Sequence, residues 1–302
     1  MNITTDQVIR FLKDQFKTGD VVVKLIFIQL FIYISLKLVG FVEWVLKLDQ
    51  HPIQGFISEW LFLPSSAKEL LIKPYTLLSY QFIHDSFWHV LVNVMLLFFF
   101  GKMIVSLQGF KKVLPIYILG GFFGGLVFVL FHSLELVPMM STPMLGASAS
   151  IMALMGAAAF LQPDYTVKFF LIFDVKLKWL VAGFGLLNLL GLSNAEGAGP
   201  GIIHVAGLIF GLAIVFLETK GIQLSKPFNM MVNSILSLFN PKPKPRVTFV
   251  NPNPVKKKKD SSTAGVKAQD KIDAILDKIS SDGYDSLSKA EKDFLFQASK
   301  KS

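Results

Sequence analysis

The sequence contains no cysteine and few charged residues. Without cysteine, disulfide bonds, thiolate metal sites and cysteine nucleophiles are all excluded. Charged residues make up 17% of the 302 residues, whereas soluble domains carry roughly 25%. Hydrophobic residues make up 52%, and they occur in runs that are longer than a soluble core requires. These features predict an integral membrane protein.

Six apolar runs predict six transmembrane helices. They cover residues 21–46, 88–107, 113–134, 146–161, 179–190 and 202–217. As a helix, the fourth run reaches roughly 24 Å, which is less than the ~30 Å hydrocarbon core of a bilayer. The segment 49–87 between the first two runs is too apolar for a hydrated loop, so we expect it to be partly helical and to lie in the membrane interface.

The basic residues predict the orientation of these helices. Lys and Arg occur before the first run, between the second and third, and between the fourth and fifth, whereas residues 135–145 and 192–200 contain neither. By the positive-inside rule, both termini are then cytoplasmic. The net charge of +9 comes mostly from the chain beyond Pro241. It marks the cytoplasmic side of a membrane protein more simply than it indicates a nucleic-acid partner.

The chain divides into four predicted parts. These are a cytoplasmic N-terminal segment (1–20), a membrane domain (21–220), a cytoplasmic Pro/Lys-rich linker (221–267) and a small helical module (268–302). The polar N-terminal segment does not resemble a cleaved signal peptide. The module combines apolar residues at helical spacing with the capping-box pattern of Ser288 and Glu291. It has no catalytic signature, so we expect it to bind a cytoplasmic partner.

The run from Gly146 to Ala149 places one serine, Ser148, among small residues. A glycine two residues before the serine lets the backbone approach closely and leaves the hydroxyl accessible. Alanine recurs every four residues from Ala149 to Ala157, so a neighbouring helix can pack closely on that face. Taken alone, the run also fits a packing seam whose serine bonds to its own helix.

Other polar residues fall at a similar depth in the predicted membrane domain. The second, fourth and sixth helices enter from the outer side, and their first turns carry His89 with Asn93, Ser148 and His204. Polar groups at membrane depth are costly unless they face one another or water, so these are functional candidates. For Asn188, in the fifth helix, we expect an interhelical hydrogen bond.

This set of residues predicts nucleophilic catalysis. A serine hydroxyl attacks when a base takes its proton, and His204 is the available base for Ser148. Attack on an amide builds an oxyanion, for which His89, Asn93 and the backbone N–H of Ser148 are candidate donors. No Asp or Glu lies beside His204 in the predicted helices, so the expected arrangement is a Ser–His dyad. A metal site at His84 and His89 is an alternative, but two histidines alone make a weak case, and we expect neither metal nor cofactor.

Several segments, in this order, resemble those of the rhomboid intramembrane serine proteases. They are Tyr75–His84, His89–Asn93, the glycine-rich third run, Gly146–Ser148 and His204–Gly211. The resemblance covers about residues 74–217 and implies six helices around a water-filled cavity. It implies that Ser148 is the nucleophile and His204 the general base. It places His89 and Asn93 at the oxyanion site.

The resemblance also implies a substrate gate and has two departures. The fifth helix and its outer loop would form the gate, in which Gly199 and Gly201 would suit a mobile element. Ala149 follows the serine where the family usually has glycine, and we expect this small residue to preserve the geometry. The pair Tyr75-Thr76 stands where the family commonly has Trp-Arg, which leaves the anchoring of the first loop open.

We therefore expect an all-α membrane protein with a six-transmembrane-helix, rhomboid-like bundle that acts as a serine endopeptidase. Its partners would be the lipid bilayer and transmembrane protein substrates, cleaved near the outer face, and its location a bacterial inner (plasma) membrane. One alternative is a non-catalytic rhomboid-like protein that binds transmembrane helices. Another is a small transporter, which would predict paired carboxylates or an inverted repeat; neither is present in the sequence.

Overall fold

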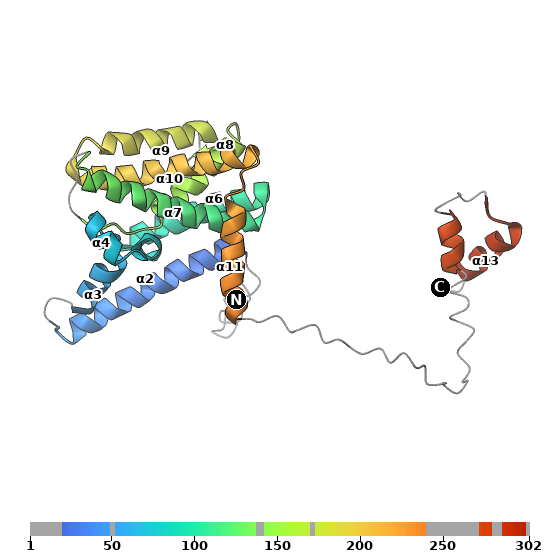
Figure 1. Ribbon diagram of the computed structural model, residues 1–302, viewed down its shortest axis with the longest axis horizontal. Coiled ribbons are helices and arrows are strands. Elements are labelled where there is room, and N and C mark those ends of the chain that lie inside the picture. Colours follow the sequence, from blue (N-terminus) through green and yellow to red (C-terminus); the bar gives the residue numbers. More distant parts are fainter. Residues whose placement is uncertain are drawn as a thin grey trace. The chain divides into compact units, whose positions relative to one another are not determined.

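Helices dominate the computed structural model, which describes residues 20–48, 52–136, 142–169, 173–239, 272–279 and 286–299. The helices of the first unit, residues 1–241, are α2 (Val21–Val45), α3 (Pro52–Leu61), α4 (Ala67–Ile72), α5 (Thr76–Ser79), the 3-10 helix η1 (Tyr80–Phe82), α6 (Phe87–Gln108), α7 (Phe110–Ser133), α8 (Ser148–Leu161), α9 (Leu177–Gly191), α10 (Ala195–Thr219) and α11 (Ser225–Phe239). In Figure 1, α9, α10 and α7 run side by side, and α2 lies on the opposite side of the bundle from α9.

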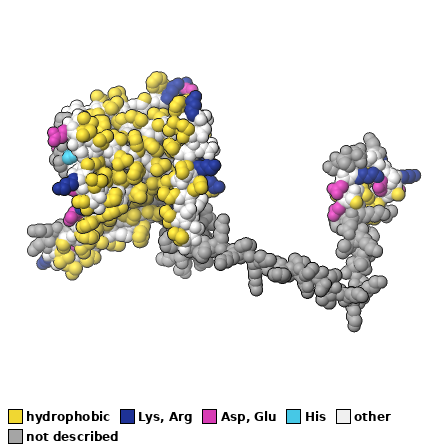
Figure 2. All heavy atoms as spheres, viewed as in Figure 1, with side chains coloured by type: hydrophobic (Ala, Val, Ile, Leu, Met, Phe, Trp, Pro, Cys, Tyr) yellow, Lys and Arg dark blue, Asp and Glu magenta, His cyan; other side chains and the backbone are white. Residues whose placement is uncertain are grey.

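The first unit is a membrane-embedded helical bundle, as predicted. Helices α2, α6, α7 and α10 are long and apolar enough to cross a bilayer, and α8 and α9 are apolar but shorter. Figure 2 shows hydrophobic side chains across the middle of the visible face and charged side chains at its two ends. The number of six membrane spans stays a prediction, because two of the apolar helices are shorter than a bilayer core.

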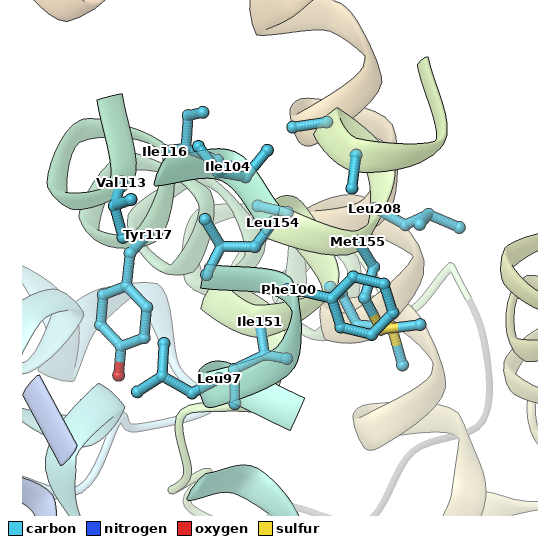
Figure 3. Packing of buried hydrophobic residues seen from close by; sticks show 14 of the residues in the cluster. Leu97, Phe100, Ile104, Val113, Ile116, Tyr117, Ile151, Leu154, Met155 and Leu208 are labelled. Carbon is cyan, nitrogen blue, oxygen red and sulfur yellow. The ribbon is translucent and has the colours of Figure 1, made fainter. Parts of the chain in front are cut away.

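Helix α8 lies at the centre of this bundle. It packs against α6, α7, α9 and α10, and its residues from Ala149 to Ala159 are all buried. In Figure 3, Ile151, Leu154 and Met155 of α8 lie among side chains of α6, α7 and α10. Ser148 is therefore the first residue of a helix that is enclosed along almost its whole length.

Glycines allow α10 to approach α8 at backbone distance. A Cβ atom on Gly207 would collide with the carbonyl oxygen of Ala149, and one on Gly211 would collide with that of Ala153. The contacts fall on the alanine stripe that the sequence predicts as a close-packing face. His204 lies one turn before Gly207, so the tight contact between these two helices also positions the histidine.

Helix α10 begins at Ala195, earlier than the predicted residue 202. The side chain of Asn194 caps it by accepting a hydrogen bond from the N–H of Gly197 at 2.7 Å. Gly199 and Gly201, which the sequence analysis puts near the outer loop and assigns to a mobile element, both lie within this helix. A Cβ on Gly201 would lie 2.6 Å from the carbonyl oxygen of Asn188 in α9, so this glycine serves close helix packing.

Two elements of the first unit were not predicted. Strands β1 (Thr166–Phe169) and β2 (Phe173–Lys176) form an antiparallel hairpin between α8 and α9. Helix α11 occupies the first part of the segment predicted as a linker, residues 221–267. Lys112 holds its start, because the Nζ atom of Lys112 lies 2.7 Å from both Glu218 Oε2 and Ser225 Oγ. The rest of that segment, from residue 240, lies outside the described residues.

Helices also occur where the sequence predicts them between α2 and α6 and in the C-terminal module. Residues 49–87 contain α3, α4, α5 and η1, whereas their depth in the interface stays a prediction. In the second unit, residues 242–302, residues 272–279 are helical and α13 spans Lys289–Ser299. The capping box is present, because the N–H of Ser288 donates to Glu291 Oε2 at 2.7 Å.

Candidate active site

All four predicted site residues line one cavity of about 500 Å³. They are Ser148, His204, His89 and Asn93. The site residues of α6 and α8 lie in the first two turns of these helices. His204 lies in the third turn of α10 and not in the first, because that helix begins earlier than predicted. Helix α9 supplies Phe184 and Asn188 to the same wall. The structure thus brings together residues that are more than 100 positions apart in the sequence.

The serine and the histidine are in direct contact. Ser148 Oγ lies 2.5 Å from His204 Nε2, a short hydrogen bond. The other ring nitrogen of the histidine, Nδ1, lies 2.7 Å from Oδ1 of Asn188. The interhelical hydrogen bond that the sequence predicts for Asn188 is therefore present, and its partner is His204. The contact links α8, α10 and α9 in one chain of hydrogen bonds.

A tight turn before α8 sets the position of Ser148. Gly146 has a φ of +118°, a region that residues with a Cβ rarely adopt. Its N–H donates to the carbonyl oxygen of Tyr80 at 2.9 Å, and the N–H of Ala147 faces His84 Nε2 at 3.4 Å. Because Ser148 is the first residue of α8, its own N–H has no acceptor within the helix and is free to bind a ligand atom.

His89 and Asn93 share one face of α6 beside this turn. A Cβ on Gly146 would lie 2.7 Å from His89 Nε2 and 3.8 Å from Ser148 Oγ, so both atoms border the space above the glycine. Asn93 uses one N–H of its amide to bond the carbonyl oxygen of His89 at 2.7 Å. Its second N–H remains available to the cavity.

Asp85 is a site residue that the sequence analysis missed. Its Oδ1 atom lies 2.8 Å from His89 Nδ1. Burial raises the pKa of Asp85, but the hydrogen bond and the charge of His89 outweigh it, and the net pKa is lowered. The carboxylate therefore stays ionised and holds the Nδ1 side of the imidazole. The four-residue spacing of Asp85 and His89 is the signal that could have identified the pair.

The segment before α6 is fastened to the core beneath the site. The hydroxyl of Tyr80 donates to the carbonyl oxygen of Gly121 at 2.6 Å, and Gln81 Oε1 accepts from Ser150 Oγ at 3.0 Å. Thr76 belongs to the pair Tyr75-Thr76, which stands where the family commonly has Trp-Arg. Its side chain is buried and donates to the carbonyl oxygen of Lys73 at 2.6 Å. These bonds anchor the loop that carries His84 and Asp85.

The two histidines proposed as an alternative metal site point to different partners. Nε2 of His84 faces the N–H of Ala147, and Nδ1 of His89 faces Asp85. Their rings meet edge to face with centroids 5.0 Å apart. Within the described residues, no group of three or more His, Cys, Asp or Glu is placed to hold a metal ion.

Comparisons with known proteins identify a matching family and named relatives. A family model described as the rhomboid domain matches residues 72–221, and one described as a family of unknown function (DUF6576) matches residues 264–301. A protein named rhomboid protease GlpG from Yersinia pseudotuberculosis serotype I (strain IP32953) is 29% identical over 170 residues, which are 54% of this chain and 55% of that protein.

A second protein of that name, from Yersinia enterocolitica serotype O:8 / biotype 1B, is 27% identical over 210 residues, which are 68% of this chain and 64% of that protein. The chain thus spans between about half and two thirds of the length of these relatives. The domain match covers α5 to α10 and the four predicted site residues Ser148, His204, His89 and Asn93. With its bundle of apolar helices, this chain is a member of the rhomboid family.

Proposed function

We propose that this rhomboid family protein is an intramembrane serine endopeptidase. Ser148 is the nucleophile, His204 is the general base, and the substrates are transmembrane segments of other membrane proteins. The observation that carries the proposal is the 2.5 Å contact between Ser148 Oγ and His204 Nε2 at the wall of a cavity. The relatives are named rhomboid proteases, which supports the same activity.

The reaction begins with transfer of the serine proton. As Oγ of Ser148 bonds to the carbonyl carbon of the substrate, its proton passes to Nε2 of His204, and the carbonyl electron pair moves onto oxygen. When the C–N bond breaks, His204 returns the proton to the leaving nitrogen. A water molecule, deprotonated by the same imidazole, then attacks the acyl-serine; the bond from the carbonyl carbon to Ser148 Oγ breaks, the imidazolium returns the proton to Oγ, and the second product leaves as a carboxylic acid.

We assign three donors to the oxyanion. They are the backbone N–H of Ser148, the free amide N–H of Asn93 and Nε2 of His89. The histidine can donate from Nε2 only when both ring nitrogens carry protons, because its Nδ1 faces Asp85. Loss of one oxyanion donor typically lowers kcat by about 100- to 1,000-fold, so each is expected to matter.

The fold also supports a location for the cut. Helices α6 and α8 begin at the cavity, and the basic residues predict that these ends face away from the cytoplasm. We place the site a short way below the outer surface of a bacterial inner membrane, with both termini in the cytoplasm. A helical substrate hides its peptide bonds in its own hydrogen bonds, so we expect cleavage near small or helix-breaking residues.

Labelling with a fluorophosphonate probe tests the proposal, because the probe reacts with activated serines. Wild type, Ser148→Ala, His204→Ala and the control Ser193→Ala, an exposed serine between α9 and α10, would be compared in detergent and in lipid. We expect labelling of wild type and the control, and a loss of more than about 100-fold in the other two. Labelling of Ser148→Ala at the wild-type rate would sink the nucleophile assignment. A folded but unlabelled wild type would favour the non-catalytic helix binder.

A further inference from the structure

We infer that Asn188 of α9 is a positioning residue for His204, so that the site operates as Ser148, His204 and Asn188 rather than as a serine and histidine alone. The inference rests on the proposed function, because it assigns a role in activating Ser148. The role also fixes the tautomer of His204, which can be measured in an inactive protein.

The hydrogen bonds of Asn188 determine which nitrogen of His204 carries the proton. The amide Nδ2 of Asn188 donates to the carbonyl oxygen of Phe184 at 2.8 Å, so the oxygen Oδ1 is the atom that faces His204 Nδ1 at 2.7 Å. An amide oxygen can only accept a hydrogen bond. Nδ1 of His204 must therefore be the donor, and the neutral ring has its lone pair on Nε2, against the serine hydroxyl.

Asn188 acts on His204 without adding a charge. In the described part of the chain, the ring nitrogens of His204 bond to Ser148 and Asn188 and to no carboxylate. A carboxylate at this depth would need a compensating partner. An amide supplies the same acceptor geometry at a lower cost of burial. This explains how the site orients its base although no acidic residue lies beside His204.

The position of α9 therefore controls the orientation of the base. The buried residues of α9 are Leu177 and Val181, near its start, and the leucines around Asn188 are exposed, with 66% of Leu187 accessible. At Asn188 itself the helix meets α10 twice, through the side chain on His204 and through the carbonyl oxygen packed on Gly201. Ser148 is activated only while this end of α9 is seated on α10.

Labelling rates of Asn188 variants test the role. In Asn188→Leu, which removes the acceptor but keeps the volume, we expect the fluorophosphonate rate to fall about 10- to 100-fold. Asn188→Asp restores an acceptor oxygen at the same place and should recover most of the rate. The matched control is Leu187→Ala, the exposed neighbour on the same turn, which should label like wild type.

Nitrogen-15 NMR of the histidines separates this inference from the proposed function. The measurement does not depend on activity, so it can be made in Ser148→Ala. In that variant the His204 signals should show a protonated Nδ1 and an unprotonated Nε2. Adding Asn188→Leu should abolish that preference. If wild type does not label but the tautomer behaves as stated, the proposed function fails and the positioning role stands. If wild type labels and a folded Asn188→Leu labels equally fast with the same tautomer, or if a folded Asn188→Asp is as slow as Asn188→Leu, the positioning role is overturned.

Discussion

Helices α8 and α9 are the two short apolar helices at the cavity, and they are held in opposite ways. In α8, every residue from Ala149 to Ala159 is buried against neighbouring helices. In α9, burial is confined to Leu177 and Val181, and the later turns expose leucine side chains. The candidate nucleophile thus stands on an element that cannot shift without unpacking its neighbours. Asn188, the hydrogen-bond partner of His204, lies on α9, which contacts its neighbours at fewer positions, and one of these contacts is that hydrogen bond.

The largest effect should come from disturbing the contact of α8 with α10. A Cβ on Gly211 would collide with the carbonyl oxygen of Ala153, which is backbone and cannot rotate away. We expect Gly211→Ala to lower the free energy of unfolding by about 3 kcal/mol, measured by thermal unfolding in detergent. The control is Gly183→Ala in α9, where the added Cβ meets nothing within 4 Å. It should change stability by less than about 1 kcal/mol and in the stabilising direction. Equal losses in the two variants would remove the contrast between the helices.

Gly146→Ala should disable the site while leaving most of the bundle folded. The new Cβ would lie 2.7 Å from His89 Nε2, and the φ of +118° would strain any residue with a side chain. We expect the labelling rate of Ser148 to fall by about 100-fold or more. Gly109→Ala is the matched control, because it shares a positive φ of +87° but has open space around the added atom. Comparable loss of labelling in Gly109→Ala would mean that backbone strain alone, and not the crowding of His89, is responsible.

The smallest effect should be found at the peripheral helix α2, whose end is stabilised locally. Asp20 Oδ1 accepts from the N–H groups of Val22 and Val23, and Oδ2 accepts from Lys102 Nζ at 2.7 Å. Burial raises the pKa of Asp20, but these hydrogen bonds outweigh it and lower the pKa below its ordinary value of 3.8. Asp20→Ala should cost about 1 kcal/mol at neutral pH.

The pH dependence of that cost checks its origin. A carboxylate with a lowered native pKa stabilises the fold fully above its unfolded pKa, and the contribution disappears as the pH falls through the native value. Thermal unfolding of wild type and Asp20→Ala should therefore converge as the pH falls below 3.8. Asp20→Asn, which keeps an acceptor for the cap without the charge, should show an intermediate loss at neutral pH. A difference that stays constant with pH would exclude the charged cap as its source.

The position of the cavity residues could be predicted because polar groups are rare at membrane depth. Two properties identify the candidates: the free-energy cost of a polar side chain inside a membrane, and a similar predicted depth. The residues with both properties, Ser148, His204, His89 and Asn93, line one cavity. Their catalytic roles stay predictions. The contact of Asn188 with His204 could not be predicted, because it depends on how α9 is rotated about its axis against α10. A sequence of leucines on most sides of α9 carries no periodic signal for that rotation.

The glycines near residue 200 were misinterpreted for a different reason. Gly199 and Gly201 flank Pro200, and this pattern is typical of loops in soluble proteins. In a membrane bundle, glycine permits backbone contact and proline is tolerated within a helix, so the same residues form the early turns of α10. The hairpin of β1 and β2 was missed because its strands are short and their side chains are mostly exposed, which leaves little alternation to detect.

The connection between α9 and α10 has a kinetic consequence. Only residues 192–194 join the two helices, and the start of α9 is tied to the preceding segment by the bond from the N–H of Leu177 to the carbonyl oxygen of Tyr165. Three residues extend over roughly 10 Å, so an α9 that moved away from α10 would stay within reach of its contacts on that helix. Asn188 then finds His204 again as an intramolecular event, at an effective concentration of about a millimolar or more. A site built in this way re-forms its hydrogen bonds whenever α9 returns to α10, without the help of a second molecule.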